Sequence, residues 1–206
     1  MADSTPTSRP RCGLVILAAG GSTRLGQPKQ LLPVGGVPLL ERAVLAGLAA
    51  PVWPIVVVLG AHAERIRPTL ARHPVLIAEN PAWAEGMASS LRAGLGVLQA
   101  FSPRIDGALL ALCDQPHFSA TTIDALLAAH AQTRRSIVAA RYGGHLGAPA
   151  LFLREHFAAL SALTGDEGAR KLITRVPPES VAAVDLPELA LDLDTPEDVA
   201  SFNRGT

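Results

Sequence analysis

Short apolar runs alternate with segments of helical length along most of this chain, and this order constrains the fold more than any other feature of the sequence. The runs do not alternate with polar residues, as a strand with one face in water would. They are typical of strands that are buried on both faces, and the longer segments between them are typical of helices. We expect such strands at 14–17, 55–59, 75–78, 108–112 and 137–140, and helices at 38–49, 63–71, 87–100 and 121–132.

The repeated order of strand and helix predicts an α/β fold with a mainly parallel sheet and helices on both faces. We expect a loop and a further strand at 143–153 and a last helix at 196–203. A chain of 206 residues, 49% of them hydrophobic, suits one well-buried core. We therefore expect a single domain over 12–206. Residues 1–11, rich in Ser, Thr and Pro without an apolar segment, predict a disordered tail and not a signal peptide.

The overall composition favours a small charged ligand over a polymer. The net charge is +0 and aromatic residues make up only 4% of the chain, which argues against a nucleic-acid partner. No apolar stretch is long enough for a membrane span, so we expect no membrane partner. The two cysteines, Cys12 and Cys113, form no C-x-x-C pair, as expected for a cytoplasmic protein with free thiols.

The first apolar run leads directly into a loop of small residues, Leu17-Ala18-Ala19-Gly20-Gly21, which is followed by Arg24 and Lys29. Small side chains let a ligand approach the backbone N–H groups, and the two cations would neutralise a polyphosphate. The stretch lacks the lysine of a P-loop, because Gln27 stands in that position, and it does not match the dinucleotide pattern G-x-G-x-x-G. An ordinary strand-to-helix turn is the alternative, and the two basic residues favour a nucleotide.

Two acidic residues follow apolar segments and are candidate metal ligands. Asp114 ends the run 108–113, where its carboxylate would lie at the carboxyl edge of the sheet, and Mg²⁺ takes one or two carboxylates together with substrate phosphates. The alternative is that Asp114 only caps the next turn. Asp194 precedes a good helix start and has no other explanation. If the fold places it beside Asp114, a divalent cation would relieve the repulsion between the two carboxylates.

Three further segments are candidates with plain structural alternatives. The segment 80–94 is either a capped helix start or a rim that contacts a nucleobase or ribose. The glycine-containing loops 143–149 and 164–171 are either plain turns or the acceptor side of a pocket, in which Arg170 or Lys171 would meet an anionic group.

As a set, the motifs resemble those of the molybdopterin nucleotidyltransferases, and most closely the molybdenum cofactor cytidylyltransferase branch. The resemblance covers nearly the whole chain after the tail. It rests on five ordered motifs: Leu17-Ala18-Ala19-Gly20-x-x-x-Arg24-Leu25-Gly26-x-x-Lys29, Gly86-Met87-x-x-Ser90-Leu91, Asp114-Gln115-Pro116, Gly165-Asp166-x-Gly168-Ala169-Arg170 and Asp192-x-Asp194-Thr195-Pro196-Glu197-Asp198.

The resemblance implies a Rossmann-like nucleotidyltransferase fold and a Mg²⁺-dependent transfer of CMP from CTP to the terminal phosphate of the molybdopterin cofactor, with release of pyrophosphate. Arg24, Lys29 and Asp114 would be catalytic, and Asp114 and Asp194 would hold the metal. The nucleotide would be bound by Leu17, Ala18, Ala19, Gly20, Gly21, Arg24, Lys29, Asn80, Gly86, Ser90 and Asp114. The phosphorylated pterin acceptor would be bound by Gln115, His145, Gly147, Asp166 and Arg170.

Three alternatives stay open at this point. The same fold and chemistry could use GTP, although the pair Ala18-Ala19 resembles the CTP-using branch, or they could act on a phosphorylated sugar or alcohol. A third alternative is a non-catalytic chaperone that hands the pterin to a molybdoenzyme. The four charged residues Arg24, Lys29, Asp114 and Asp194 argue against a mere carrier, which has less need of metal ligands.

Overall fold

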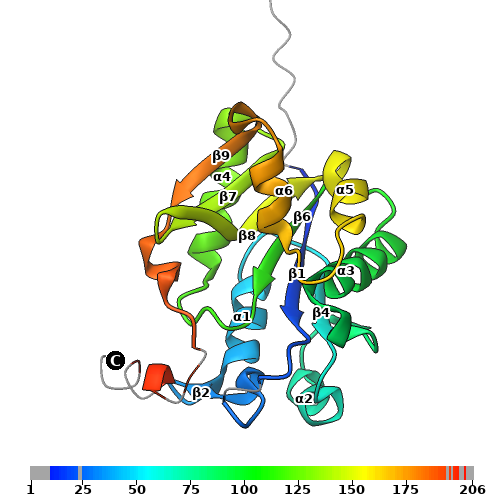
Figure 1. Cartoon of the computed structure of the whole chain (residues 1–206), viewed down its shortest axis with the longest axis vertical. Helices are drawn as coiled ribbons and strands as arrows, with labels where there is room; N and C mark the ends of the chain where they lie inside the picture. Colours follow the sequence, from blue (N-terminus) through cyan, green and yellow to red (C-terminus); the bar gives the residue numbers. More distant parts are fainter. Residues whose placement is uncertain (1–9, 23–24, 194, 196, 200–201, 203–206) are drawn as a thin grey trace, which may run out of the picture.

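A seven-stranded sheet runs through the chain in the computed structural model, which describes residues 10–22, 25–193, 195, 197–199 and 202 (Figure 1). The strand order is β5-β4-β1-β6-β8-β7-β9, and a separate antiparallel hairpin joins β2 to β3. The strands are β1 (Cys12–Ala18), β2 (Pro33–Val34), β3 (Val37–Pro38), β4 (Ile55–Leu59), β5 (Leu76–Glu79), β6 (Gly107–Leu112), β7 (Ile137–Tyr142), β8 (His145–Leu153) and β9 (Val181–Asp185).

Helices cover both faces of this sheet. Side chains of α1, α2 and α4 pack in one apolar cluster with the strands, and side chains of α3, α5 and α6 pack in a second cluster on the other face. The α-helices are α1 (Leu39–Leu48), α2 (Ala63–Leu70), α3 (Met87–Phe101), α4 (Ala120–Thr133), α5 (Phe157–Ser161) and α6 (Ala169–Arg175). Short 3-10 turns are η1 (Lys29–Leu31), η2 (Trp83–Glu85), η3 (Arg154–His156), η4 (Pro178–Ser180) and η5 (Pro187–Ala190).

The predicted fold class is confirmed. Strands β5, β4, β1 and β6 are parallel to one another, β8 runs antiparallel to both β6 and β7, and β9 is parallel to β7. The strands and helices expected from the apolar runs and the segments between them begin and end within two residues of the structure's elements. The division of the chain into a tail and a single domain stays a prediction.

Three elements differ from the expectations or go beyond them. Strand β5 is not buried on both faces: it lies at the edge of the sheet, and of its residues only Ala78 is buried. The hairpin β2–β3 and the strand β9 were not expected, because each strand of the hairpin has only two residues and the sequence between 153 and 196 predicts helical stretches. The expected helix at 196–203 lies partly outside the described residues, and residues 197–199 are helical.

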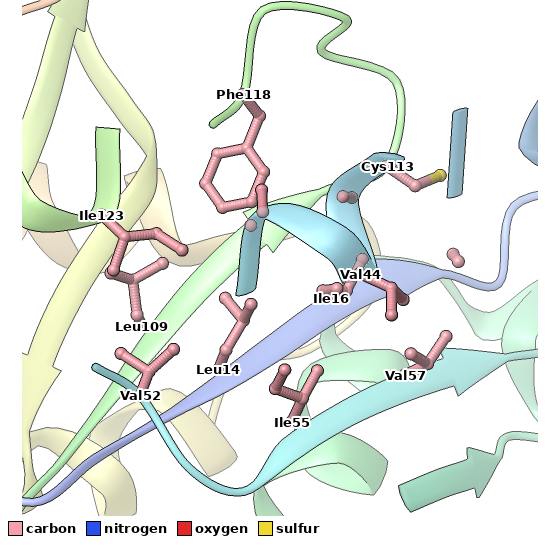
Figure 2. Close-up of a cluster of buried hydrophobic side chains, with 14 of the residues drawn as sticks. Leu14, Ile16, Val44, Val52, Ile55, Val57, Leu109, Cys113, Phe118 and Ile123 are labelled. Carbon is pink, nitrogen blue, oxygen red and sulfur yellow. The ribbon is translucent and has the colours of Figure 1, made fainter. Parts of the chain in front are cut away.

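Alternate side chains of the central strands enter the two clusters. Leu14 and Ile16 of β1 pack in the cluster of α1 and α4, whereas Val15 packs in the cluster of α3. Figure 2 shows the first cluster, where Cys113 lies among the apolar side chains just beyond the end of β6. Burial raises the pKa of the Cys113 thiol to about 12, so this residue is the small buried hydrophobe that its surroundings predict.

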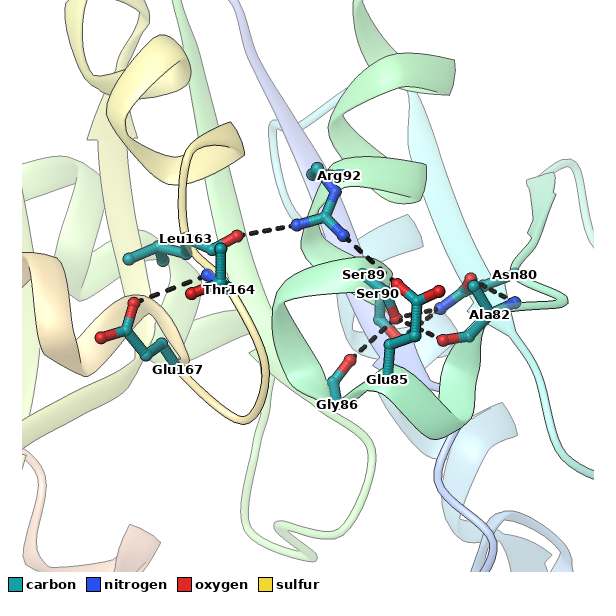
Figure 3. Close-up of polar contacts among 10 residues, drawn as sticks. All are labelled: Asn80, Ala82, Glu85, Gly86, Ser89, Ser90, Arg92, Leu163, Thr164 and Glu167. Carbon is teal, nitrogen blue, oxygen red and sulfur yellow. Dashed lines mark hydrogen bonds and ion pairs between the residues drawn. The ribbon is translucent and has the colours of Figure 1, made fainter.

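One loop, 163–168, crosses over the start of α3. The Gly165 carbonyl accepts a hydrogen bond from the Ala88 N–H at 3.0 Å. Figure 3 shows a second contact, in which Arg92 Nη1 donates to the Leu163 carbonyl at 2.7 Å. At the crossing, Gly86 has a φ of +108°, and a Cβ there would lie 2.4 Å from the Gly165 carbonyl. The close crossing therefore requires glycine at position 86.

We expect the stability of the protein to fall steeply above pH 9. Burial raises the pKa values of Cys12 and Cys113 to about 12, whereas an unfolded thiol has a pKa of about 8.5, so the unfolded state loses these protons first. Each thiol should lower the free energy of unfolding by up to ~1.4 kcal/mol per pH unit between pH 9 and 12. Urea unfolding of wild type and Cys113→Ala at several pH values between 9 and 12 measures this effect, and the free energy of unfolding should fall less steeply with pH in the variant. Equal slopes would contradict the prediction.

The crossing of Gly86 and Gly165 gives a second prediction. Gly86→Ala should lower the free energy of unfolding by about 1–3 kcal/mol, because the new methyl group meets backbone atoms and φ is positive. Gly96 is the matched control, since it lies inside the same helix and a Cβ there meets no atom within 4 Å. Gly96→Ala should raise stability by roughly 0.5–1 kcal/mol. Chemical denaturation measures the free energy of unfolding of both variants. An unchanged value for Gly86→Ala would show that the loop 163–168 can move away from the added methyl group.

Candidate active site

A cavity of about 380 Å³ opens at the carboxyl ends of β1 and β6, where ligands bind in open α/β sheets. The loop after β1, the start of α3 and the residues after β6 surround it. Its lining residues are Leu17, Ala18, Ala19, Gly20, Gly21, Lys29, Gln30, Trp83, Ala84, Gly86, Met87, Ser90, Leu112, Cys113, Asp114 and Asp166. The structure thus brings most of the predicted nucleotide residues to one place.

The small-residue loop leaves open space beside its backbone. A Cβ added to Gly20 would meet no atom within 4 Å, so packing inside the protein does not require glycine there. Ser22 adopts a left-handed conformation with φ of 52°, and its hydroxyl accepts a hydrogen bond from the Lys29 N–H at 3.0 Å. This bond ties the end of the loop to η1 and brings the Lys29 side chain to the cavity.

Lys29 and Asp114 form an ion pair in the cavity wall, between Nζ and Oδ2. The two side chains are 17% and 16% exposed, so the charges are held largely out of water. Asp114 Oδ1 is buried and has no hydrogen-bond partner among the described residues. An unpartnered carboxylate oxygen of this kind is costly unless a ligand satisfies it, and oxygen is the donor that hard divalent cations prefer.

The last part of the chain returns to the backbone of Asp114. The Leu193 N–H donates to the Asp114 carbonyl at 3.2 Å. The residue after it, Asp194, lies outside the described residues, as does Arg24, so their predicted roles as metal ligand and triphosphate ligand stay predictions. Among the residues that are described, no three His, Cys, Asp or Glu side chains gather as a metal site. Mg²⁺ needs fewer, because substrate phosphates and waters complete its shell.

Asn80 organises the side of the cavity near α3, without lining it. It is 5% exposed, and its Nδ2 donates to the hydroxyls of Ser89 at 2.8 Å and Ser90 at 3.0 Å (Figure 3). Its Oδ1 accepts from the Ala82 N–H at 3.1 Å. Ser90 lines the cavity, so Asn80 positions a hydroxyl that a ligand can reach.

A second cavity, of about 310 Å³, adjoins the first. Both are lined by Leu17, Met87, Leu112 and Asp166. Four of the predicted acceptor residues line the second cavity, namely His145, Gly147, Asp166 and Arg170. Its walls otherwise come from α3, β6, the hairpin of β7 and β8, and α6.

Gln115, the fifth predicted acceptor residue, lies beneath this cavity and does not line it. The side chain is buried, and Nε2 donates to the Tyr142 hydroxyl at 3.1 Å and to the Ala148 carbonyl at 3.2 Å. Tyr142 in turn donates to Ala148 at 2.5 Å, and burial raises the pKa of its hydroxyl. Gln115 therefore holds Tyr142 at the acceptor side, and its own contact with the acceptor stays a prediction.

Several residues of the lining were not singled out from the sequence, among them one buried glutamine and two aromatic residues. Gln30 and Trp83 line the first cavity and Tyr142 lines the second. A glutamine between Lys29 and an apolar residue carries no signal of its own, and burial of its amide depends on the rest of the fold. Trp83 and Tyr142 stand out only as two of the few aromatic residues in a chain with 4% of them.

Known proteins of similar sequence and structure match this chain over most of its length. Nicotine blue oxidoreductase of Paenarthrobacter nicotinovorans is 36% identical over 173 residues, which cover 79% of this chain and 81% of that protein. A crystal structure from Mycobacterium sp. strain JC1, a homologue of Rv0371c of Mycobacterium tuberculosis, has a TM-score of 0.80 at 30% identity and covers 97% of this chain and 100% of its own. Rv0371c in complex with manganese has a TM-score of 0.75 at 28% identity and covers 95% of this chain and 100% of its own.

A family model, the MobA-like NTP transferase domain, matches residues 14–187, which include most of β1, all of β6 and the lining residues of both cavities. This match agrees with the resemblance to molybdopterin nucleotidyltransferases and with the Rossmann-like fold. The chain belongs to the MobA-like NTP transferase family and is a nucleotidyltransferase.

Proposed function

We propose that this nucleotidyltransferase moves CMP from CTP to the terminal phosphate of a molybdopterin-type cofactor, with Mg²⁺, and releases pyrophosphate. The observation that carries the proposal is the pair of adjoining cavities, which meet at Leu17, Met87, Leu112 and Asp166. The first has small residues and a lysine, as a nucleoside triphosphate requires. The second has a basic residue, Arg170, beside apolar walls, which suits a phosphorylated ring system.

The metal belongs at Asp114. Its Oδ1 has no hydrogen-bond partner among the described residues and can coordinate the ion. Its Oδ2 becomes available when the Lys29 side chain pairs with the phosphates of CTP instead. Asp194, the residue after Leu193, is the second carboxylate that we propose for the ion. The related Rv0371c binds manganese, another divalent ion that accepts oxygen ligands. When bound, the ion supplies positive charge against the phosphate oxygens.

In the proposed reaction, an oxygen of the acceptor's terminal phosphate attacks the α-phosphorus of CTP. The new bond forms between that oxygen and the phosphorus, and the bond from the α-phosphorus to the oxygen bridging to the β-phosphate breaks. Its electron pair leaves with pyrophosphate. A phosphate nucleophile is already ionised near neutral pH, so the reaction needs no base from the protein. Lys29 and Arg24 neutralise the triphosphate, and catalysis consists of positioning and charge neutralisation.

CTP is favoured because Ala18 and Ala19 match the CTP-using branch of the family that the sequence resembles. GTP, or a phosphorylated sugar or alcohol as acceptor, is the main alternative. A carrier without catalysis, which would hand the pterin to a molybdoenzyme, is the other. One relative is named an oxidoreductase, but the loop after β1 lacks the G-x-G-x-x-G pattern of dinucleotide binding.

We place this activity in the cytoplasm, with a molybdoenzyme as recipient of the product. None of the described helices is long and apolar enough to cross a bilayer.

Pyrophosphate release tests the proposed function directly. Purified protein would be incubated with Mg²⁺, the molybdopterin form of the cofactor and each nucleoside triphosphate in turn. CTP should give the fastest release, and omission of the pterin or chelation of the metal should abolish it. Pyrophosphate release with GTP and with no other triphosphate would show that GTP, not CTP, is the substrate. Binding of the pterin without pyrophosphate release from any triphosphate would favour the non-catalytic carrier.

Removing either partner of the ion pair should abolish most of the activity. Lys29→Met should reduce kcat by about 10²- to 10³-fold, roughly 3–4 kcal/mol in the transition state, and Asp114→Asn should lose metal-dependent turnover. The matched controls are Arg72→Met and Asp124→Asn, because both side chains are exposed, Arg72 just after α2 and Asp124 on α4, and neither lines a cavity described above. Near-wild-type turnover of either site variant in the pyrophosphate assay would remove that residue from the mechanism.

Arg170 should act on the acceptor and not on CTP. It lines the second cavity, and a third cavity of about 550 Å³ continues past it and His145. Arg170→Ala should raise the KM for the pterin acceptor about tenfold, close to 1.4 kcal/mol, while the KM for CTP changes less than twofold. Arg175→Ala, on the same helix but paired with Glu167 at 3.0 Å, is the control. An equal rise of both KM values would place Arg170 in the nucleotide site instead.

A further inference from the structure

Gln30 is a fully buried polar residue beside the nucleotide cavity, and the proposed reaction gives it no role. Its side chain is 0% exposed, yet the residue borders the cavity between Lys29 and the small-residue loop. Its Nε2 donates to two carbonyls of that loop, Ala18 at 2.8 Å and Gly20 at 3.0 Å. Burial of an amide is costly unless it is hydrogen-bonded, so these bonds determine how the side chain lies.

The orientation of the amide follows from its partners. An amide nitrogen carries two hydrogens and supplies one to each carbonyl, whereas a flipped amide would place oxygen against two oxygens. Oε1 therefore lies on the other side of the group, where it is buried without a partner among the described residues. Asp114 Oδ1 is in the same condition, and both residues line the same cavity. The polar network around this cavity is thus incomplete without a ligand.

The carbonyls between Ala18 and Gly21 all have partners in the protein. Gln30 takes two of them, the Ala61 N–H donates to the Ala19 carbonyl at 3.0 Å, and His62 Nε2 lies 3.3 Å from the Gly21 carbonyl. In a trans peptide the N–H points opposite to the carbonyl. The N–H groups of Ala19 and Gly21 therefore point away from Gln30, and both residues line the cavity.

We propose that Gln30 is a positioning residue, which turns the Ala18 and Gly20 carbonyls away from the nucleotide and the N–H groups of the following residues toward its phosphates. The inference rests on the proposed function, because it assumes that a nucleoside triphosphate fills this cavity. Loop carbonyls facing a polyanion would repel it, whereas backbone N–H groups attract it. Gln30 and Lys29 are adjacent in η1, so one short turn supplies a cation and orients the neutral donors.

Two variants of Gln30 separate this role from simple core packing. Gln30→Met keeps the length of the side chain and removes the donor, and it should weaken binding of Mg²⁺–CTP at least tenfold in isothermal titration calorimetry. Gln30→Glu can donate only while its carboxyl group is protonated, so its affinity for CTP, relative to wild type, should fall as the pH rises from 5 to 8. The affinity of Gln30→Met relative to wild type should stay constant over the same range. The KM for the acceptor should change less than twofold in both.

The control is Gln99→Met on α3, whose Nε2 donates to the Leu95 carbonyl at 3.3 Å far along the helix, and which should bind CTP as wild type does. A thermal melt of each variant reports folding. If Gln30→Met fails to fold, the pH dependence of Gln30→Glu decides the question. CTP affinities of both Gln30 variants within twofold of wild type at every pH, with a lowered melting temperature, would overturn the inference and leave the proposed function standing. Wild type that binds neither CTP nor GTP would overturn both.

Discussion

Parallel pairing of β1 with β6 is the constraint on which the rest of the molecule depends. The register places Leu17 opposite Leu112, so the chain leaves both strands at the same edge of the sheet. The loop that starts at Ala18 and the carboxylate of Asp114 consequently emerge side by side. Both strands are buried on both faces, which leaves this edge as the place where polar groups can meet a ligand without disturbing the core.

The charges of Lys29 and Asp114 oppose each other at this edge. A carboxylate that is only 16% exposed is costly alone, and Lys29 compensates it through one oxygen. The second oxygen stays without a partner, as does Gln30 Oε1 in the same cavity. The site therefore holds two unsatisfied acceptors beside the ion pair of Lys29 and Asp114.

The loop that crosses the start of α3 divides the space into two cavities. Gly86 permits the crossing, and Arg92 and the Ala88 N–H hold the loop in place (Figure 3). Asp166, at the tip of this loop, borders both cavities. Two ligands can therefore lie end to end and meet beside Asp166, with α3, β6, the hairpin of β7 and β8, and α6 around the second one. This division explains how one small sheet serves a reaction between two substrates.

The amino-acid sequence by itself determined the order and boundaries of the central strands and helices, because apolar periodicity is a local property that burial on both faces imposes. It also indicated Asp114, which directly follows such a run, and Lys29, which lies beyond the small-residue loop that follows another. Only the tertiary structure decided the reversed direction of β8, the position of Gln115 beneath the acceptor cavity and the contact of Gln30 with the loop carbonyls. The hydrogen-bond partners of a buried amide come from distant parts of the chain, as Leu189 does for Gln115, so no local sequence pattern predicts these partners.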